Sequence, residues 1–354
     1  MSKAMNNLFI LHTQYNLILG SGIAKELAGD KSYLVLYAEF PVTDTILNNL
    51  RAVFSDVIVV KDRFSPPAAR FAEIKEIKEA IRKTKALERI PFDRIFLSQE
   101  RRFDTLLAYR CSKRSTPAVI DVEEDAYYSI HPERKPPKKT LKGRFFDILR
   151  RITLGKNPYF RTDGIFYGAN PIYSEAYLLF PSVARSEMQN KTLREMTGDM
   201  LFGGIEALYA DKKTKYPDAK KYLLLFFDLM NRYRDKQAIL LTTRAVIEAA
   251  KEKGYTVLAK YHPRETEKFT DMSELFELEQ FMPAEKVLAD LKDKELVVFG
   301  NATTVCTVAA KLGKRVVSVA KIDHPENTVM HSAMEKMGIL LVASAEEATK
   351  AFDN

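Results

Sequence analysis

Two short motifs carry side chains suited to acid–base chemistry, and they lie far apart in the 354-residue sequence. The first is the acidic triplet Glu123-Glu124-Asp125, and the second is Lys260-Tyr261-His262-Pro263. A carboxylate can take a proton from a reacting hydroxyl, and a histidine near a lysine can donate to phosphate oxygens. Together the motifs predict proton transfer on a phosphate-bearing substrate.

Each motif stands where an apolar run ends. The acidic triplet follows Ala118–Val122, and His262 follows Tyr255–Lys260. In α/β proteins the carboxyl ends of parallel strands meet at one edge of the sheet, where ligands bind. We therefore expect both motifs at strand ends, pointing into a cleft between two domains.

The rest of the chain alternates apolar runs with segments of helical periodicity, which predicts parallel sheets covered on both faces. Further strands are expected at Leu8–Leu11, Tyr33–Tyr37, Val57–Val60, Arg94–Leu97, Tyr222–Phe227, Glu295–Phe299, Arg315–Val319 and Gly338–Val342. Helices are expected after an N-cap at Thr13 and at Ala68–Leu87, Asp104–Cys111, Gln237–Lys251, Ala284–Leu291 and Thr304–Leu312. This order predicts an α/β fold with two Rossmann-like, doubly wound domains, residues 1–200 and 201–354.

Three histidines precede a proline, and their surroundings separate them. His131 lies in a basic, proline-rich stretch and His324 in a polar stretch, so we expect both in surface turns. His262 directly follows a strand, and Pro263 would stiffen the turn that presents its ring. A structural role, with the ring bonded to a neighbouring carbonyl, is the alternative for His262.

Several familiar sites have no signature in the sequence. There is no Gly-x-Gly-x-x-Gly or Gly-Lys-Ser/Thr loop, no His-Glu-x-x-His metal motif and no Gly-x-Ser-x-Gly elbow. Cys111 and Cys306 are the only cysteines, each within an expected helix, which indicates a reducing cytoplasm. The apolar stretch Leu8–Ala24 is interrupted by polar residues, so we expect a soluble or peripheral protein.

The formal net charge is +8, and much of the excess lies in an insertion at residues 132–158. Basic residues between Arg134 and Lys156 alternate with apolar ones. From Lys142 onward this pattern predicts a basic amphipathic helix that lies on an anionic bilayer and brings the protein to a lipid-linked acceptor. A solvated insertion without lipid contact is the alternative.

The ordered motifs resemble those of the bacterial sialyltransferases and polysialyltransferases of the two-domain GT-B fold, in glycosyltransferase family 52 and also family 38. Those families carry an Asp/Glu-Asp/Glu-Gly motif, a Lys-x-His-Pro motif and a later Ser/Thr pair. Here the matching segments are Glu124-Asp125-Ala126, Lys260-Tyr261-His262-Pro263, Pro283-Ala284-Glu285, Thr303-Thr304 and the opening Asn7–Gln14 with His12 and Thr13. Alanine stands at position 126 in place of the family glycine, and Glu123 is an additional acid.

The resemblance implies an inverting transfer of sialic acid from CMP-sialic acid to a glycan hydroxyl, without a metal or other cofactor. Glu124 would be the catalytic base, with Asp125 as second choice, and His262 would stabilise the departing phosphate. Supporting contacts to the substrates would come from Lys260, Pro263, Glu285, Thr303, Thr304, His12, Thr13 and Gln14. For three of these groups local structure offers another explanation: an acid cluster at a helix start for the acidic pair, an ordinary N-cap for Thr303 and a first-turn acid for Glu285.

The expected partners are a CMP-sugar donor and a glycan acceptor such as bacterial lipooligosaccharide or capsule, with peripheral contact to the inner face of the cytoplasmic membrane and a homodimer left open. Two alternatives remain: a transferase of the same fold that uses CMP-Kdo or a hexose donor, and a non-catalytic polyanion-binding protein. Nucleic acid is not an expected partner, because the sequence has no nucleic-acid-binding signature and no tryptophan.

Overall fold

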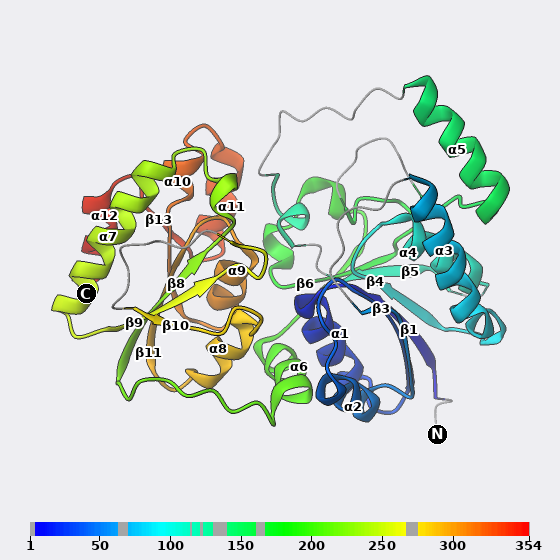
Figure 1. The fold of residues 1–354 in the computed structure, drawn as a ribbon, viewed down its shortest axis with the longest axis horizontal. Helices are drawn as coiled ribbons and strands as arrows, with labels where there is room; N and C mark the ends of the chain where they lie inside the picture. Colours follow the sequence, from blue (N-terminus) through cyan, green and yellow to red (C-terminus); the bar gives the residue numbers. More distant parts are fainter. Residues whose placement is uncertain are drawn as a thin grey trace. The chain divides into compact units, whose positions relative to one another are not determined.

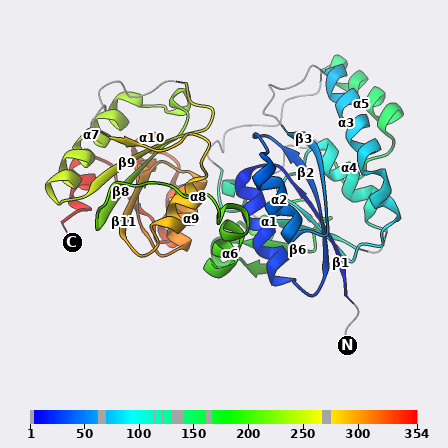
Figure 2. The same cartoon turned by 60° about the horizontal axis from the view of Figure 1, so that its bottom comes forward.

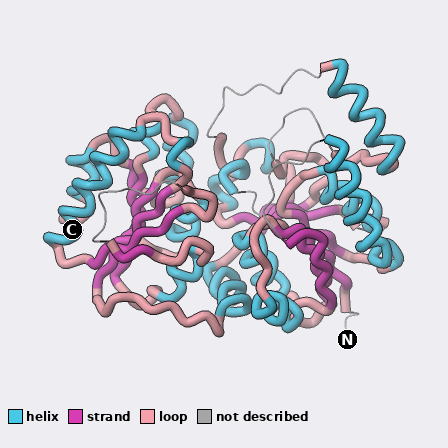
Figure 3. Tube along the Cα trace, in the orientation of Figure 1, coloured by secondary structure: helices cyan, strands magenta, loops and turns pink. Residues whose placement is uncertain are grey.

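The computed structural model describes residues 4–62, 70–113, 115–120, 123–129, 140–160, 167–266 and 275–353, without the side chains of residues 62, 70, 123, 124 and 142. The chain divides into two compact units. Met1–Ala126 and His131–Ala210 form the first unit, and Tyr127–Ile130 and Asp211–Asn354 form the second. Strands and helices alternate in both (Figure 3), which confirms the predicted α/β class.

The first unit is built on a seven-stranded sheet of order β3-β2-β1-β4-β5-β6-β7, in which every described pairing is parallel. Its strands are β1 (Asn6–Leu11), β2 (Lys31–Ala38), β3 (Asp56–Asp62), β4 (Arg94–Leu97), β5 (Pro117–Ile120), β6 (Glu175–Leu178) and β7 (Thr192–Glu195). Its helices are α1 (Gln14–Glu26), α2 (Asp44–Val53), α3 (Arg70–Thr84), α4 (Arg102–Cys111), α5 (Leu141–Leu154) and α6 (Gly198–Tyr209). The strand order reverses between β1 and β4, so this unit has the Rossmann-like topology that places a ligand at that point.

Helices cover both faces of the first sheet. Contacts join α1, α2 and α6 into one group and α3, α4 and α5 into another, and these groups lie on opposite sides of the strands (Figures 1 and 2). Helix α6 was not predicted; it spans position 200, where the domain boundary was placed, and ends close to the end of the first unit. The contact of α6 with α1 depends on Gly22 and Gly204, because a Cβ at Gly22 would come within 2.2 Å of the Met200 carbonyl oxygen and one at Gly204 within 2.0 Å of the Ile18 oxygen.

The second unit contains a six-stranded sheet of order β10-β9-β8-β11-β12-β13, again parallel in every described pairing. Its strands are β8 (Lys221–Phe227), β9 (Thr256–Tyr261), β10 (Phe276–Glu277), β11 (Glu295–Gly300), β12 (Arg315–Ser318) and β13 (Leu340–Leu341). Its helices are α7 (Lys236–Glu252), α8 (Ala284–Asp290), α9 (Thr304–Lys311), α10 (Ala320–Asp323), α11 (Thr328–Lys336) and α12 (Ala345–Lys350). The order reverses between β8 and β11, so the second unit repeats the Rossmann-like topology.

The central strands of the second unit are apolar on both faces, as expected for a parallel sheet between helices. Six of the seven residues of β8 are buried, and the core on one face joins strand residues to α7 and to Phe352 near the end of the chain. Helix α7 packs against α12, and α8 against α9 (Figure 1). Because the strands are parallel, the polar residues that follow them all lie at one edge of the sheet, the edge formed by the carboxyl ends of the strands.

Candidate active site

Polar residues follow each central strand of the second sheet at its carboxyl edge. Asp228 follows β8, His262 follows β9, Asn301 follows β11, and Asp323 ends the short helix α10 after β12. The strand order reverses between β8 and β11, so the residues after these strands flank the place where this topology binds ligands.

The backbone holds His262 firmly at the end of β9. Its N–H donates to the Phe227 carbonyl oxygen at 2.9 Å, and its own carbonyl oxygen accepts from the N–H of Glu265 at 2.9 Å. Its ring Nδ1 accepts from the N–H of Arg264 at 3.1 Å. In the neutral imidazole the proton therefore lies on Nε2, which makes Nε2 the donor that His262 can offer to a ligand.

The surroundings keep the His262 ring neutral. Burial lowers its pKa to about 4, the positive charges of Arg264, Arg232 and Lys260 lower it further, and Asp228 opposes them. At neutral pH the ring is thus an uncharged hydrogen-bond donor among cations. Such a group, placed beside positive charges, suits an incoming phosphate.

Lys260 is almost fully buried, and its described hydrogen bonds go to the protein. Its Nζ donates to the carbonyl oxygens of Tyr261 and Gln280, both at 2.8 Å. Burial lowers its pKa to about 8, against the attraction of Glu285 and Glu279. In this structure Lys260 ties the end of β9 to the segment before α8, and its predicted contact with the nucleoside stays a prediction.

Glu285 lies in the first turn of α8, directly after the N-cap Pro283 and Ala284. It is 6% exposed. Burial raises the pKa of its carboxyl group, and Lys260 opposes that rise. Lys260 and Glu285, each predicted to contact the substrate, therefore lie close enough for their charges to influence one another.

A residue that the sequence did not single out, Gln280, secures the turn after His262. Its Nε2 donates to the carbonyl oxygens of His262 at 3.2 Å, Pro263 at 3.3 Å and Glu265 at 2.7 Å. No motif in the sequence marks this glutamine. Pro263 thus contributes a stiff backbone and an accepting carbonyl to a turn closed by Gln280.

Thr303 and Thr304 stand at the start of α9, with Thr303 as the N-cap and both half-buried. The Thr303 hydroxyl lies 3.5 Å from Cys306 Sγ, and it makes no cap hydrogen bond to a helix N–H. Gly300, the last residue of β11, lies close to the same sulfur: a Cβ there would come within 3.2 Å of Cys306 Sγ, so the cysteine side chain would have to shift. The two hydroxyls and the positive end of the α9 dipole form a donor set of the kind that binds phosphate.

A buried polar network fixes the loops beside this helix. Asp323 accepts from Asn301 Nδ2 at 2.6 Å and from the Arg234 N–H at 2.7 Å, and its carboxylate lies 3.2 Å from His324 Nε2. Burial would raise the pKa of Asp323, but these partners hold it below its ordinary value. The prediction that His324 lies in a surface turn is wrong, because the histidine is 3% exposed and packs on the buried carboxylate. His131 lies outside the described residues.

The acidic motif forms a short 3-10 helix, Glu123–Ala126, at the end of the first unit's β5 region. The side chain of Glu124 lies outside the described part of the chain. Burial raises the pKa of Asp125, while the Tyr167 N–H and Arg185 oppose that rise. Ala126 is buried and helical, so the position where the family has glycine demands no left-handed backbone here.

The first unit also contains a buried ionic cluster around His12 that the sequence reasoning found only in part. His12 follows β1 and is fully buried, with Nε2 2.6 Å from Asp104 Oδ1 and Nδ1 3.5 Å from Glu39 Oε1. Arg101 pairs with Glu39 from the other side. Glu39 follows β2 and Arg101 follows β4. The feature of the sequence that could have identified them is a charged residue soon after an apolar strand.

The electrostatics of this cluster favour a charged histidine. Burial lowers the pKa of His12, but Asp104 and Glu39 outweigh it and the pKa is raised. Burial opposes ionisation of Glu39, yet His12 and Arg101 lower its pKa to about 2. Thr13 caps α1 by accepting from the Asn16 N–H at 3.1 Å, as predicted, and Gln14 begins that helix. The substrate contacts predicted for His12, Thr13 and Gln14 stay predictions.

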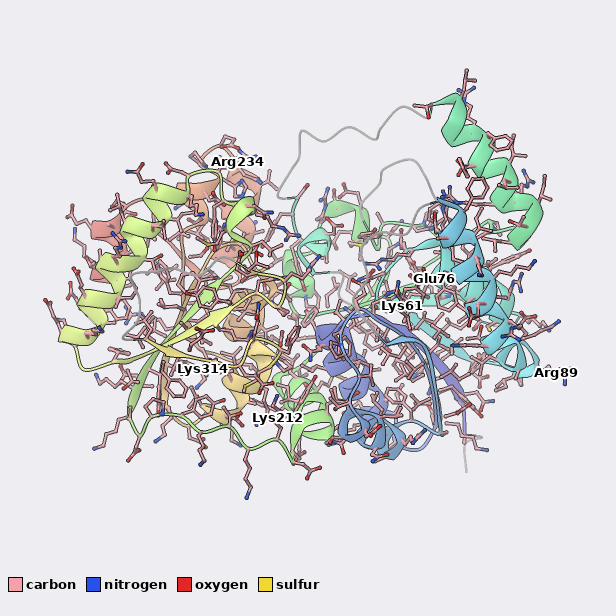
Figure 4. All side chains as sticks on the ribbon, viewed as in Figure 1. Lys61, Glu76, Arg89, Lys212, Arg234 and Lys314 are labelled. Atoms are coloured by element: carbon pink, nitrogen blue, oxygen red, sulfur yellow. The ribbon has the colours of Figure 1, made fainter. Side chains whose placement is uncertain are left out.

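Another charged pair lies on the same unit at a distance from His12 in the sequence. Lys61 Nζ lies 2.8 Å from Glu76 Oε1, and Tyr37 also bonds this carboxylate. Figure 4 labels Lys61 and Glu76 side by side.

Among the described residues, no group of three or more His, Cys, Asp or Glu side chains is arranged to hold a metal ion.

Comparison with known proteins places the strand-edge residues of the second unit in a family segment. Residues 226–319 match the family described as A-2_8-polyST, alpha-2,8-polysialyltransferase (POLYST). This segment contains His262, Glu285, Thr303 and Thr304. The sequence matches no curated protein at a significant level.

Solved structures with a similar fold cover nearly the whole chain. The UDP-GlcNAc 2-epimerase of Neisseria meningitidis, bound to UDP-GlcNAc, has a TM-score of 0.59 at 12% identity, covering 99% of this chain and 91% of its own. The Methanocaldococcus jannaschii UDP-GlcNAc 2-epimerase, in complex with UDP-GlcNAc and UDP, has 0.57 at 12%, covering 99% and 92%. CalG4, the calicheamicin glycosyltransferase, has 0.53 at 15%, covering 99% and 89%.

At these identities the solved structures show the fold, which is of the GT-B type with two Rossmann-like sheets. The family match adds the sialyltransferase character over residues 226–319. The predicted fold is thereby confirmed over the chain, and the predicted resemblance to sialyltransferases is supported over residues 226–319.

Proposed function

We propose that this glycosyltransferase moves sialic acid from CMP-sialic acid to a hydroxyl group of a glycan acceptor, with inversion and without a metal ion. The observation that carries the proposal is His262, which offers a neutral Nε2–H donor at a strand end within the polysialyltransferase-like segment. In this reaction the bond from the sugar to the CMP phosphate breaks, and negative charge grows on the phosphate.

The second unit supplies groups suited to that charge. His262 would donate to a phosphate oxygen, and Thr303 and Thr304 would donate from the start of α9. An arriving phosphate anion raises the pKa of a neighbouring imidazole. The neutral His262 of the free protein can therefore become a better proton donor as the leaving group departs.

The first unit supplies the acceptor side in this proposal. Glu124 would take the proton of the acceptor hydroxyl as its oxygen bonds to the sugar, with Asp125 as second choice. The raised pKa of Asp125 supports a role as base, since a base works best when its pKa approaches the working pH. His12, Thr13 and Gln14 would contribute to acceptor binding, with His12 fixing the loop through Asp104 and Glu39.

The nucleoside would lie near Glu285 and Lys260. The Glu285 carboxyl group, buried and with a raised pKa, would hydrogen-bond to ribose hydroxyls. Lys260 would keep the β9 turn in place through its two carbonyl partners. Pro263 would limit the freedom of the same turn.

We infer that the acceptor is a bacterial surface glycan, such as lipooligosaccharide or capsule, built at the inner face of the cytoplasmic membrane with the enzyme in peripheral contact. Donor sugars used by other transferases of the same fold remain outcomes of the test. UDP is included because the solved epimerases are bound to UDP-GlcNAc or UDP.

The test is calorimetric titration of the protein with CMP, UMP, UDP and GDP, each with and without EDTA. We expect selective CMP binding that EDTA does not change and that His262→Ala abolishes. His131→Ala is the matched control, because it alters another histidine followed by proline, and it should bind CMP as the unaltered protein does. Preference for UDP or GDP would overturn the donor, and absence of nucleotide binding would favour the polyanion-binding alternative.

A further inference from the structure

Helix α5 exposes a continuous apolar stripe. Leu141, Phe145, Ile148 and Ile152 are between 59% and 85% exposed. At about 100° per residue, their positions fall within an arc of roughly 60° along about three turns of helix. A stripe of four large apolar side chains on one helix face is more than the scattered exposure that is ordinary on a protein surface.

The opposite face of α5 is anchored to its own unit. Phe146 is buried and makes an edge contact with Phe71 of α3, with ring centroids 5.0 Å apart. Arg150 pairs with Glu73 and with Asp147. These contacts fix the rotation of the helix, so the apolar stripe is turned away from the protein by the packing and not by chance.

The charges on α5 are basic beside this stripe. Arg144 and Arg151 are exposed, and on a helical wheel both lie on the same flank, roughly 70–90° from the centre of the stripe. Between residues 140 and 156 Asp147 is the single acid, against five lysines and arginines, and it pairs with Arg102 and Arg150. An apolar stripe bordered by arginines is complementary to a surface whose outer layer is anionic and whose interior, just beneath that layer, is apolar.

We propose that α5 docks in the plane of an anionic lipid bilayer, with the stripe among the upper acyl chains and Arg144 and Arg151 at the lipid phosphates. A second copy of this chain fits the stripe less well, because it would bring the same arginines together. No helix in the described part of the chain is long and apolar enough to cross a membrane, so α5 would lie on the bilayer. This inference does not depend on the donor or on the reaction.

The chain has no tryptophan, so a single introduced indole reports on its own position. Phe145→Trp places the probe in the stripe, and Leu241→Trp places it at another exposed apolar position, on α7, as a matched control. The full-length variants are mixed with phosphatidylcholine vesicles containing no, or about one third, phosphatidylglycerol, some with brominated acyl chains. We expect a blue shift and bromine quenching for Phe145→Trp with anionic vesicles at low salt, and neither for Leu241→Trp.

Vesicle co-sedimentation tests the two chemical components separately. Arg144→Gln and Arg151→Gln should each weaken binding to anionic vesicles about fivefold, as expected for one basic residue near a charged surface. Replacing Phe145, Ile148 and Ile152 by serine should lower binding by roughly tenfold or more. The control, Leu241→Ser with Val329→Ser, should bind as the unaltered protein, and circular dichroism confirms folding of each variant.

Three results would overturn the proposal. One is binding of the unaltered protein that ignores both anionic lipid and salt. Another is equal quenching at positions 145 and 241. The third is a dimer in solution that the triple serine variant converts to monomer without a change in vesicle binding, which would assign the stripe to a second copy.

Discussion

The two units place a histidine at corresponding edges of their sheets and give it opposite properties. His12 follows β1 in the first unit, fully buried between Asp104 and Glu39, and its pKa is raised. His262 follows β9 in the second unit, half-buried among Arg232, Arg264 and Lys260, and its pKa falls to about 4. Burial lowers the pKa of both rings. At His12 two carboxylates outweigh burial, whereas at His262 one carboxylate, Asp228, is opposed by three positive charges and burial prevails.

The contrast separates a structural from a chemical use of the same residue type. Both ring nitrogens of His12 face carboxylates of its own unit, which leaves the ring committed to holding loops together. In the described part of the chain, the His262 ring bonds to the backbone through Nδ1, which accepts from Arg264, and Nε2–H is the donor proposed for a ligand. In the proposed reaction, the environment of the ring and not its place after a strand distinguishes His262, the donor to the phosphate, from His12.

The largest effect should come from removing the available donor. We expect His262→Ala to reduce turnover with CMP-sialic acid by about 10²–10³, the range measured when one donor to a developing negative charge is lost. Thermal unfolding should change little, since the ring is neutral and half-buried. A transferase assay beside a melting curve checks both. If turnover fell only as far as unfolding explains, His262 would have a structural role like that of His12.

The next effect concerns stability. Asp104→Ala leaves the His12 ring without its 2.6 Å partner in a fully buried site, and we expect unfolding free energy to fall by about 3 kcal/mol. Urea unfolding measures the loss. The double variant His12→Gln with Asp104→Asn replaces the ion pair by an amide pair. Its loss of unfolding free energy should be smaller than the sum of the losses in the single variants His12→Gln and Asp104→Asn. Strict additivity would show that the two side chains do not act together.

The sequence predicted the strands that carry these residues better than the elements around them. Arg94–Leu97 is confirmed with the same bounds, because a buried parallel strand is an uninterrupted apolar run. The missed strand Thr192–Glu195 is short and polar at a sheet edge. Helix α6 was missed because Gly203-Gly204 suggests a break, whereas the packing on α1 requires the second of these glycines.

The candidate site was predictable only where it is local. His262 could be placed from the strand before it, and Thr303 as an N-cap from the strand and helix around it. The Asp104 and Glu39 partners of His12 come from separate elements, and no spacing links them. The three carbonyls bound by Gln280 likewise depend on the path of a turn 15 to 18 residues away.

The pH dependence of stability should differ between the two sites. The charged His12 stabilises the fold fully below its ordinary pKa of 6.5, and this contribution is lost as pH rises through the raised folded value. The ionised Glu39 stabilises the fold above its ordinary pKa of 4.5, and this stabilisation is lost as pH falls toward its folded pKa of about 2. For His262 the folded pKa is lowered to about 4, so stability falls as pH drops from 6.5 to 4.

Melting temperatures of the unaltered protein, His12→Gln and His262→Gln between pH 4.5 and 8.5 test these directions. We expect His12→Gln to be most harmful near pH 5 to 6 and less harmful at pH 8.5. His262→Gln should gain relative stability below pH 6. The same pH trend in both variants would contradict the opposite charge environments.

The smallest effects should come from the exposed arginines that tune the two rings. Arg101 lowers the pKa of His12 and Arg264 lowers that of His262, so Arg101→Ala and Arg264→Ala should each raise the pKa of the nearby ring. Histidine ring resonances followed by NMR across pH measure both. At neutral pH the His262 ring stays neutral because its pKa starts from about 4, and loss of the half-exposed Arg101–Glu39 pair should cost less than about 1 kcal/mol. If Arg264→Ala instead left the His262 ring unchanged, burial alone would keep that ring neutral, and the positive neighbours would matter for phosphate binding and not for the charge of the histidine.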